Sequence, residues 1–377
     1  MTIRRFAILG AALGFMAVMA GSTQATEVKL KAASFLPSRT VFAKYFKNWV
    51  THTNKQCSGM FKISIVGPAA IKTLEQWNAL KNGVIDLHYG PPNYYKGVMV
   101  EGDVTILAKN EAADQRKNGA WAMLNELHKK KMNAIYLTNL LNGVNFYLYT
   151  NKPAVNKRFE GFRLRSVPIY DGFFKYLGGT PVRMSPGQLY TALERKAVDG
   201  YGWPLWGVKD FGWHKHTKYR YGPGFFSANV NIIANQDKYN SLSGKARKCM
   251  MDQAVWLEDQ WPKWRTNEDA MQTKPQDDAG IKYVDMGPGF AKKAEELYWT
   301  QLLDAAPAFI NKIQPLLNSL KSGLGHSVRV PQSAICLFLN VKKRNYWKSI
   351  RRARLHRQFL CGAGSNYGLC FGSHYCW

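Results

Sequence analysis

An arginine-bearing segment in the middle of the chain has a pattern that could bind a carboxylate. Residues 162–168 read Phe-Arg-Leu-Arg-Ser-Val-Pro, and their alternation predicts a strand with Arg163 and Arg165 on one face. Ligands of open α/β sheets bind beyond the carboxyl ends of the strands, and a guanidinium holds a carboxylate through two parallel hydrogen bonds. The segment therefore predicts a site for an organic acid. A structural ion pair is the alternative interpretation of an arginine on a strand.

Strand-like and helix-like segments alternate along the chain and would position this site. The echo between residues 79–86 and 192–199 supports two similar lobes, each built from βαβ units around a mainly parallel sheet. A strand at 229–234 is expected to return to the first lobe, and a long helical region at 242–269 is expected to break or bend near Pro262. Other expected strands are 28–33, 61–66, 162–167 and 181–184, with one more following the turn at 83–87 and one following 197–200. The other expected helices are 41–53, 73–82, 170–177 and 186–194.

The first 25 residues have the pattern of a secretory signal peptide. Arg4 and Arg5 precede an apolar run of fifteen residues at 6–20, and small residues at 23–25 offer a cleavage site. A membrane anchor needs about 20 apolar residues, and no other segment is long and apolar enough to span a bilayer. The sequence therefore predicts a soluble mature protein that is exported from the cytoplasm.

The formal charge of +27 is unevenly spread along the 377 residues. Residues 321–377 carry ten Lys or Arg and no acidic residue, and their composition differs sharply from the rest. This shift favours a translated frameshift or read-through; a genuine basic appendage and a disulfide-rich cap are the alternatives. The overall charge also leaves open a polyanion-binding or nucleic-acid-binding protein.

Motifs for catalysis and for metal binding are missing from the sequence. It contains no nucleophile elbow, phosphate-binding glycine loop or dinucleotide fingerprint, so we expect a protein that is not an enzyme and needs no cofactor. His214 and His216 alternate as strand ligands could, but two ligands are too few for a metal site. Cys57 and Cys249 could pair in an oxidising compartment, and the sequence leaves their pairing open.

Five short motifs, in order, resemble the DctP-type extracytoplasmic solute receptors of tripartite ATP-independent periplasmic (TRAP) transporters. The resemblance covers about 290 residues, from 27 to 320. It implies a two-lobed α/β fold with hinge strands and a long connecting helix, which closes over one carboxylate and delivers it to membrane subunits. The expected lobes are 26–150 with about 230–270, and 151–229 with about 271–320. The motifs are residues 80–86, 161–168, 177–182, 190–193 and 197–204.

The resemblance singles out Arg165 as the group that binds the substrate carboxylate, and two departures bear on the ligand. Asn145 stands where many relatives carry a second arginine, and Trp203 stands where many carry an asparagine. Both changes lower the charge or polarity of the predicted pocket, and burying a second carboxylate without a cation would be unfavourable. We therefore expect a monocarboxylate, such as a 2-oxo or aromatic acid, with a C4-dicarboxylate as the alternative. Trp203 could instead pack the lobes together.

Further candidates follow from strand ends and from the same resemblance. Phe35, Tyr89 and Asn93 lie near the ends of first-lobe strands, and Tyr201 belongs to the last motif. Glu75 lies where relatives often place an acidic residue near the ligand, although a solvent-exposed helix residue explains it equally well. No acidic residue adjoins Trp203, so we expect no substrate-bound metal ion.

Overall fold

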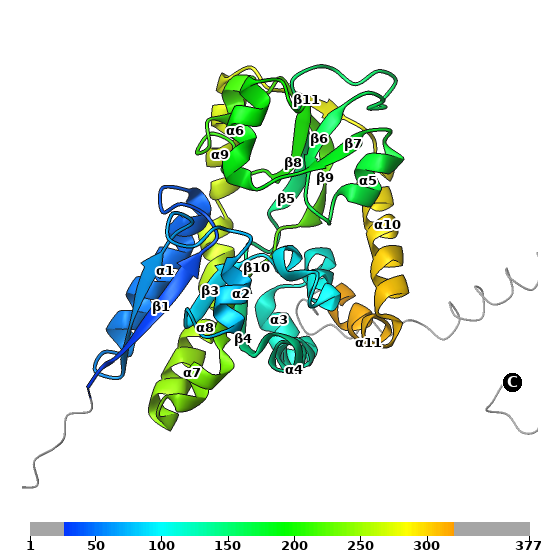
Figure 1. The fold of residues 1–377 in the computed structure, drawn as a ribbon. Coiled ribbons are helices and arrows are strands. Elements are labelled where there is room, and N and C mark those ends of the chain that lie inside the picture. Colours follow the sequence, from blue (N-terminus) through cyan, green and yellow to red (C-terminus); the bar gives the residue numbers. More distant parts are fainter. Residues whose placement is uncertain (1–25, 320–377) are drawn as a thin grey trace, which may run out of the picture. The chain divides into compact units, whose positions relative to one another are not determined.

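Two β-sheets organise residues 26–319, the part of the chain that the computed structural model describes (Figure 1). The expected signal peptide at 1–25 and the atypical tail at 321–377 lie outside these residues, so both stay predictions. No helix within residues 26–319 combines the length and apolar character needed to cross a membrane.

The first sheet has the strand order β2-β1-β3-β10-β4 and forms the core of the first lobe. β1 runs parallel to β2 and to β3, whereas β10 is antiparallel to both of its neighbours. This confirms that the chain returns to the first lobe near residue 230. The strands are β1 Val28–Ser34, β2 Phe61–Val66, β3 Leu87–Gly90, β4 Ala134–Leu140 and β10 Val230–Asn235.

The second sheet has the order β11-β9-β5-β8-β6-β7 and forms the core of the second lobe. β6 lies parallel to β7 and β8, and β5 is antiparallel to β8 and β9. Each lobe thus combines parallel βαβ units with an antiparallel strand next to a crossover. The strands are β5 Asn145–Thr150, β6 Arg163–Ser166, β7 Thr180–Arg183, β8 Gly200–Pro204, β9 Tyr219–Ser227 and β11 Lys282–Asp285.

Helices surround the sheets, and amphipathic spacing explains how they pack. In α1, for example, Phe42, Phe46 and Trp49 are buried against the first sheet. The longer helices are α1 Val41–Gln56, α4 Ala120–Met132, α6 Pro186–Glu194, α8 Gly244–Arg265, α9 Glu268–Asp278, α10 Gly289–Ala305 and α11 Pro307–Asn318. The short ones are α2 Gln76–Lys81, α3 Ala112–Lys117, α5 Asp171–Tyr176 and α7 Gln236–Ser241, with 3-10 helices η1 Pro92–Tyr95, η2 Val100–Leu107 and η3 Trp213–His216.

The lobe boundaries differ from those expected at two places. β5 belongs to the second sheet, so the chain leaves the first lobe at residues 141–144 rather than at 150. α11 packs against η2 and α4 of the first lobe, so the end of the described chain returns there. Strand alternation shows that 145–150 is extended but does not show which sheet it joins, which explains the first difference.

Two expected helices also differ in detail. The helix expected at 73–82 begins only at Gln76, and the Thr73 hydroxyl donates to the Phe35 carbonyl. Leu74, which precedes the observed helix, is exposed. α8 continues past Pro262 to Arg265 before α9 begins at Glu268, so the break comes slightly later than predicted.

A disulfide bond joins Cys57, at the end of α1, to Cys249 on α8. The pairing that the sequence left open therefore exists in the structure. It links two helices of the first lobe across 192 residues of sequence.

Candidate functional site

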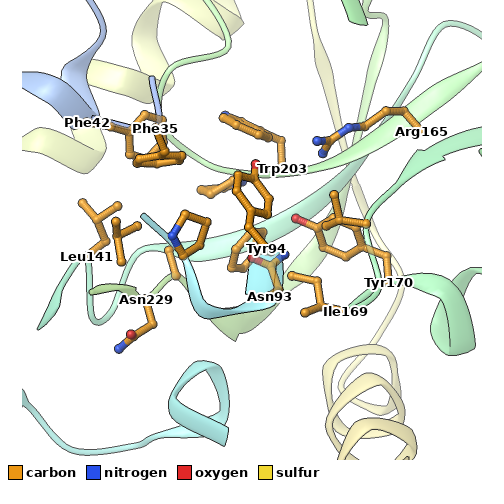
Figure 2. Close-up of a pocket in the computed structure, with 16 residues that line it drawn as sticks. Phe35, Phe42, Asn93, Tyr94, Leu141, Arg165, Ile169, Tyr170, Trp203 and Asn229 are labelled. Carbon is orange, nitrogen blue, oxygen red and sulfur yellow. The ribbon is translucent and has the colours of Figure 1, made fainter. Parts of the chain in front are cut away.

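A cavity lies between the lobes at the carboxyl ends of their strands (Figure 2). The space in it that is open to the centre of a water molecule is about 40 Å³. Its walls are mostly aromatic and aliphatic. The lining residues labelled in Figure 2 are Phe35, Phe42, Asn93, Tyr94, Leu141, Arg165, Ile169, Tyr170, Trp203 and Asn229.

Arg165 brings a buried positive charge to this cavity. It is the third residue of β6, and only 1% of its surface is exposed. Its Nε donates to the Met184 carbonyl at 3.2 Å and its Nη1 to the Gly202 carbonyl at 3.4 Å. Within residues 26–319 its Nη2 has no hydrogen-bond partner, and no carboxylate forms an ion pair with it. A buried charge without a counter-ion is unfavourable, so an anion in the cavity would stabilise it.

Arg163, on the same face of the strand by alternation, has a different environment. Its side chain is about half exposed and pairs with Asp199 at 3.5 Å, and its Nη2 donates to the Lys196 carbonyl at 2.5 Å. Strand position separates the two arginines, because Arg163 starts β6 and Arg165 lies near its carboxyl end. The structural interpretation of a strand arginine thus fits Arg163.

Two tyrosine hydroxyls lie near the Arg165 guanidinium. Figure 2 shows the rings of Tyr94 and Tyr170 with their hydroxyl oxygens toward the space that Arg165 faces. Burial raises the pKa of both hydroxyls, while the Arg165 charge partly opposes the rise. Both therefore stay protonated at neutral pH and can donate hydrogen bonds to an anion.

Trp203 lines the cavity with its ring but does not offer its N–H to a ligand. The indole Nε1 donates to the Trp206 carbonyl at 2.9 Å. The ring meets Phe42 of the first lobe edge to face, with the centroids 5.9 Å apart. The two roles expected for Trp203, an apolar wall and a lobe contact, therefore occur together. Phe35 also lines the cavity, as expected.

Asn93, another candidate, also lines the cavity, whereas the remaining candidates lie outside it. Asn145 is exposed at the start of β5, and the next residue, Phe146, lines the cavity instead. Glu75 is exposed and lies 3.9 Å from the Lys72 ammonium, as its alternative interpretation predicted.

Tyr89 and Tyr201 are completely buried behind the cavity wall. Tyr89 stacks on Phe46 and donates to the Phe42 carbonyl at 3.2 Å. Tyr201 stacks on Tyr149, and its hydroxyl lies 2.8 Å from that of Thr217. The structure gives both residues packing roles, not ligand-facing ones.

The sequence analysis missed Tyr94, Tyr170 and Asn229 as cavity residues. Tyr170 lies two residues beyond the 161–168 motif, so the loop after that strand was an available signal. Tyr94 belongs to η1, a short 3-10 helix after Pro91 that has no periodic pattern to reveal its orientation. Asn229 lies at the crossover from β9 to β10, where its amide donates to Asn142 Oδ1 at 3.1 Å.

No group of three or more metal-ligating side chains gathers anywhere in residues 26–319. His214 and His216 lie in η3, a 3-10 helix, rather than on a strand as considered above. Their spacing therefore does not place them on one strand face.

The sequence of residues 32–300 matches the family model of the bacterial extracellular solute-binding proteins, family 7 (DctP). The protein belongs to this family. Family 7 proteins are extracytoplasmic solute-binding receptors, not enzymes, and this agrees with a ligand cavity between two lobes.

Solved structures share the two-lobed fold of this family 7 protein. A TRAP periplasmic solute-binding protein from Ralstonia eutropha H16, with bound (S)-2-acetolactate, has a TM-score of 0.66 and 18% identity, covering 77% of this chain and 98% of its own. The extracytoplasmic solute receptor DctP7 of Bordetella pertussis, which binds pyroglutamic acid, has a TM-score of 0.68 and 14% identity, covering 77% and 99%. A Desulfovibrio salexigens protein with bound orotic acid has a TM-score of 0.66 and 14% identity, covering 77% and 96%.

One curated relative also matches part of the chain. An uncharacterised protein of Haemophilus influenzae is 34% identical over 110 residues, which are 26% of this chain and 32% of the relative. The match thus spans about a third of that relative's length.

Proposed function

We propose that this protein captures a monocarboxylate, such as a 2-oxo or aromatic acid, in the periplasm and delivers it to the membrane subunits of a TRAP transporter. The Arg165 guanidinium would hold the carboxylate, with the Tyr94 and Tyr170 hydroxyls as further donors. Closure of the two lobes around the acid would shield it from water.

The observation that carries this proposal is the environment of Arg165. Its side chain is buried, lines the cavity, keeps Nη2 without a partner and has no ion pair within residues 26–319. A carboxylate would supply both the missing charge and the missing acceptor. The guanidinium would contribute most to affinity because the site is largely shielded from solvent.

The preference for one carboxylate follows from the charges on the cavity wall. Arg165 is the lone formally charged residue among the side chains that line the cavity. A second carboxylate would therefore be desolvated without a cation of its own. The three acids bound to the solved relatives named above each carry a single carboxyl group, which supports the same preference.

A ligand screen combined with one substitution tests the proposal. The purified protein is unfolded and refolded to strip any bound acid, and its melting temperature is measured with monocarboxylates, 2-oxo acids, aromatic acids and C4-dicarboxylates. A ligand at a hundred times its dissociation constant adds about 2.7 kcal/mol of stability, which gives a visible shift. Arg165→Gln should weaken binding more than tenfold, since removing one partner of a buried, hydrogen-bonded charge pair costs about 2–5 kcal/mol.

Arg163→Gln is the matched control, because it removes the same charge from the same strand outside the cavity. It should leave the affinity near that of the wild type. Unchanged affinity of Arg165→Gln would remove this residue from the site, and a response to diacids alone would overturn the monocarboxylate preference.

A further inference from the structure

A second and larger cavity lies beside the Arg165 cavity, also between the lobes. The space in it that is open to the centre of a water molecule is about 240 Å³. Its walls are largely apolar, with Arg39 contributing a cation. The lining residues include Leu36 and Arg39 of the first lobe, and Tyr190, Phe211 and Trp213 of the second.

The indole of Trp203 stands between the two cavities. Trp203 lines the Arg165 cavity, whereas Phe211 and Trp213 line the second one. The Trp203 ring packs edge to face on both, with centroid distances of 5.7 Å to Phe211 and 4.9 Å to Trp213. In the first lobe, the consecutive residues Phe35 and Leu36 each line one of the two cavities.

Several contacts fix the position of this indole. Its Nε1 donates to the Trp206 carbonyl at 2.9 Å, and its edge meets the Phe42 ring. The Arg165 guanidinium carbon lies 5.5 Å from its ring centroid, a cation–π distance. Rotation of the indole would break the hydrogen bond and the aromatic contacts together, so the wall between the cavities is rigid.

We propose that Trp203 is a partition that sets the upper limit of ligand size. The space beside Arg165 that admits water centres, about 40 Å³, has room for about three water molecules. An acid of a few carbon atoms fits such a space, whereas an aromatic acid would have to displace the indole. This inference rests on the proposed function, and it selects short 2-oxo monocarboxylates from the acids named there.

The second cavity indicates which acids should bind when the Trp203 indole is removed. Its apolar walls suit the aliphatic or aromatic body of a longer acid whose carboxylate remains on Arg165. Removing the indole would enlarge the Arg165 cavity toward the Phe211 and Trp213 rings of the second one, so a single substitution would move the preference from short acids to long ones.

The test measures dissociation constants by calorimetry for pyruvate, 2-oxobutanoate, 2-oxohexanoate and phenylpyruvate. The wild type should bind the two short acids at least tenfold more tightly than the two long ones. Trp203→Ala should bind 2-oxohexanoate or phenylpyruvate at least tenfold more tightly than the wild type does, and pyruvate more weakly. Trp203→Leu, which keeps an apolar side chain in place, should show the same change to a smaller degree.

Tyr190→Ala is the control, because it widens the second cavity without opening the partition. The ratio of its affinities for short and long acids should match that of the wild type. Equal affinity of the wild type for pyruvate and phenylpyruvate, or an unchanged length preference in both folded Trp203 variants, would overturn the partition alone. Binding of none of these acids or of any other carboxylate by the wild type would overturn the proposed function, and the partition with it.

Discussion

The backbone N–H of Val41 donates a hydrogen bond to Oδ2 of Asp210 at 2.7 Å, and this bond joins the two lobes. Val41 is the first residue of α1 in the first lobe, and Asp210 lies between β8 and η3 of the second. The carboxylate thus meets the positive end of a helix dipole as well as a free N–H group. Next to it, the Phe42–Trp203 ring contact also crosses between the lobes.

Asp210→Ala should weaken ligand binding although Asp210 does not line the ligand cavity. The bond exists only when the lobes are as close as they are here, so its loss favours a more open arrangement. For a partly exposed charge we expect a loss of about 1 kcal/mol, which corresponds to about fivefold weaker binding. Calorimetry with the acid found in the ligand screen measures this change in the dissociation constant.

Asp259→Ala provides the comparison, because Asp259 is an exposed aspartate on α8. It changes the net charge by the same amount and should leave affinity unchanged. Equal losses in both variants would attribute the effect to overall charge and not to the contact between the lobes.

Tyr170→Phe should weaken carboxylate binding about tenfold or more. The variant keeps the ring and loses one hydroxyl donor, and hydrogen bonds to charged groups contribute about 1.5–3 kcal/mol. Tyr176→Phe, on the exposed side of α5, should bind like the wild type. Similar affinities of Tyr170→Phe and the wild type would show that this hydroxyl does not contact the acid.

The same hydroxyls predict how binding depends on alkaline pH. Burial raises the pKa of Tyr94 and Tyr170 above the ordinary value of 10.0, so both remain donors up to that pH. Titrations from neutral pH to about pH 9 should therefore give a constant affinity. A decline centred well below pH 10.0 would mean that neither hydroxyl is shielded as the structure has it.

The strand that carries Arg165 is where the sequence and the structure agree in detail. Arg165 lies near the carboxyl end of β6, as alternation and the family resemblance together implied. Asn145 illustrates the limit of such reasoning, because a shift of one residue along a strand moves a side chain to the other face. In β5 the cavity receives Phe146 and leaves Asn145 exposed.

The positions of side chains in short loops could not be predicted from the periodicity of the sequence. Glu75 precedes a helix that starts later than expected, which leaves its side chain in solvent beside Lys72. Tyr94 reaches the cavity from a single 3-10 turn whose orientation depends on tertiary packing. The partition by Trp203 likewise depends on aromatic contacts with η3 and its preceding loop, which alternation along β8 does not reveal.

His88→Leu should make the protein less sensitive to acid. The His88 ring is completely buried on β3 and neither nitrogen has a hydrogen-bond partner within the described residues, so burial lowers its pKa from 6.5 to about 3. The folded state therefore keeps His88 neutral, while the unfolded chain takes up a proton below pH 6.5. Its contribution to stability is complete above pH 6.5 and is lost as the pH falls toward 3.

Urea unfolding at several pH values measures this effect. A depressed histidine pKa removes about 1.4 kcal/mol of stability for each pH unit in that window. Between neutral pH and pH 5, His88→Leu should therefore lose about 2 kcal/mol less of its unfolding free energy than the wild type does. Parallel pH curves for the two proteins would contradict the prediction.

Gly143→Ala should disrupt the crossover from the first lobe to the second. Gly143 has φ +82°, a conformation that L side chains rarely adopt, and a Cβ there would overlap the Arg265 guanidinium. Arg265 donates to the Asn142 carbonyl and pairs with Glu111 at 3.1 Å, while the Trp261 Nε1 donates to the same carbonyl at 3.0 Å. An added methyl group would thus push apart the contacts that hold this crossover against α8.

Gly161→Ala separates this overlap from backbone strain. Gly161 has φ +76°, but nothing lies within 4 Å of the Cβ that alanine would add. The strain of a left-handed residue should lower the unfolding free energy of Gly161→Ala by about 1–2 kcal/mol, and that of Gly143→Ala should fall further. Gly143→Ala should also bind the acid more weakly. Urea unfolding and calorimetry measure the two effects. Equal losses of stability with unchanged affinity in both variants would mean that Arg265 moves aside freely, and that its contacts with the crossover do not control lobe closure.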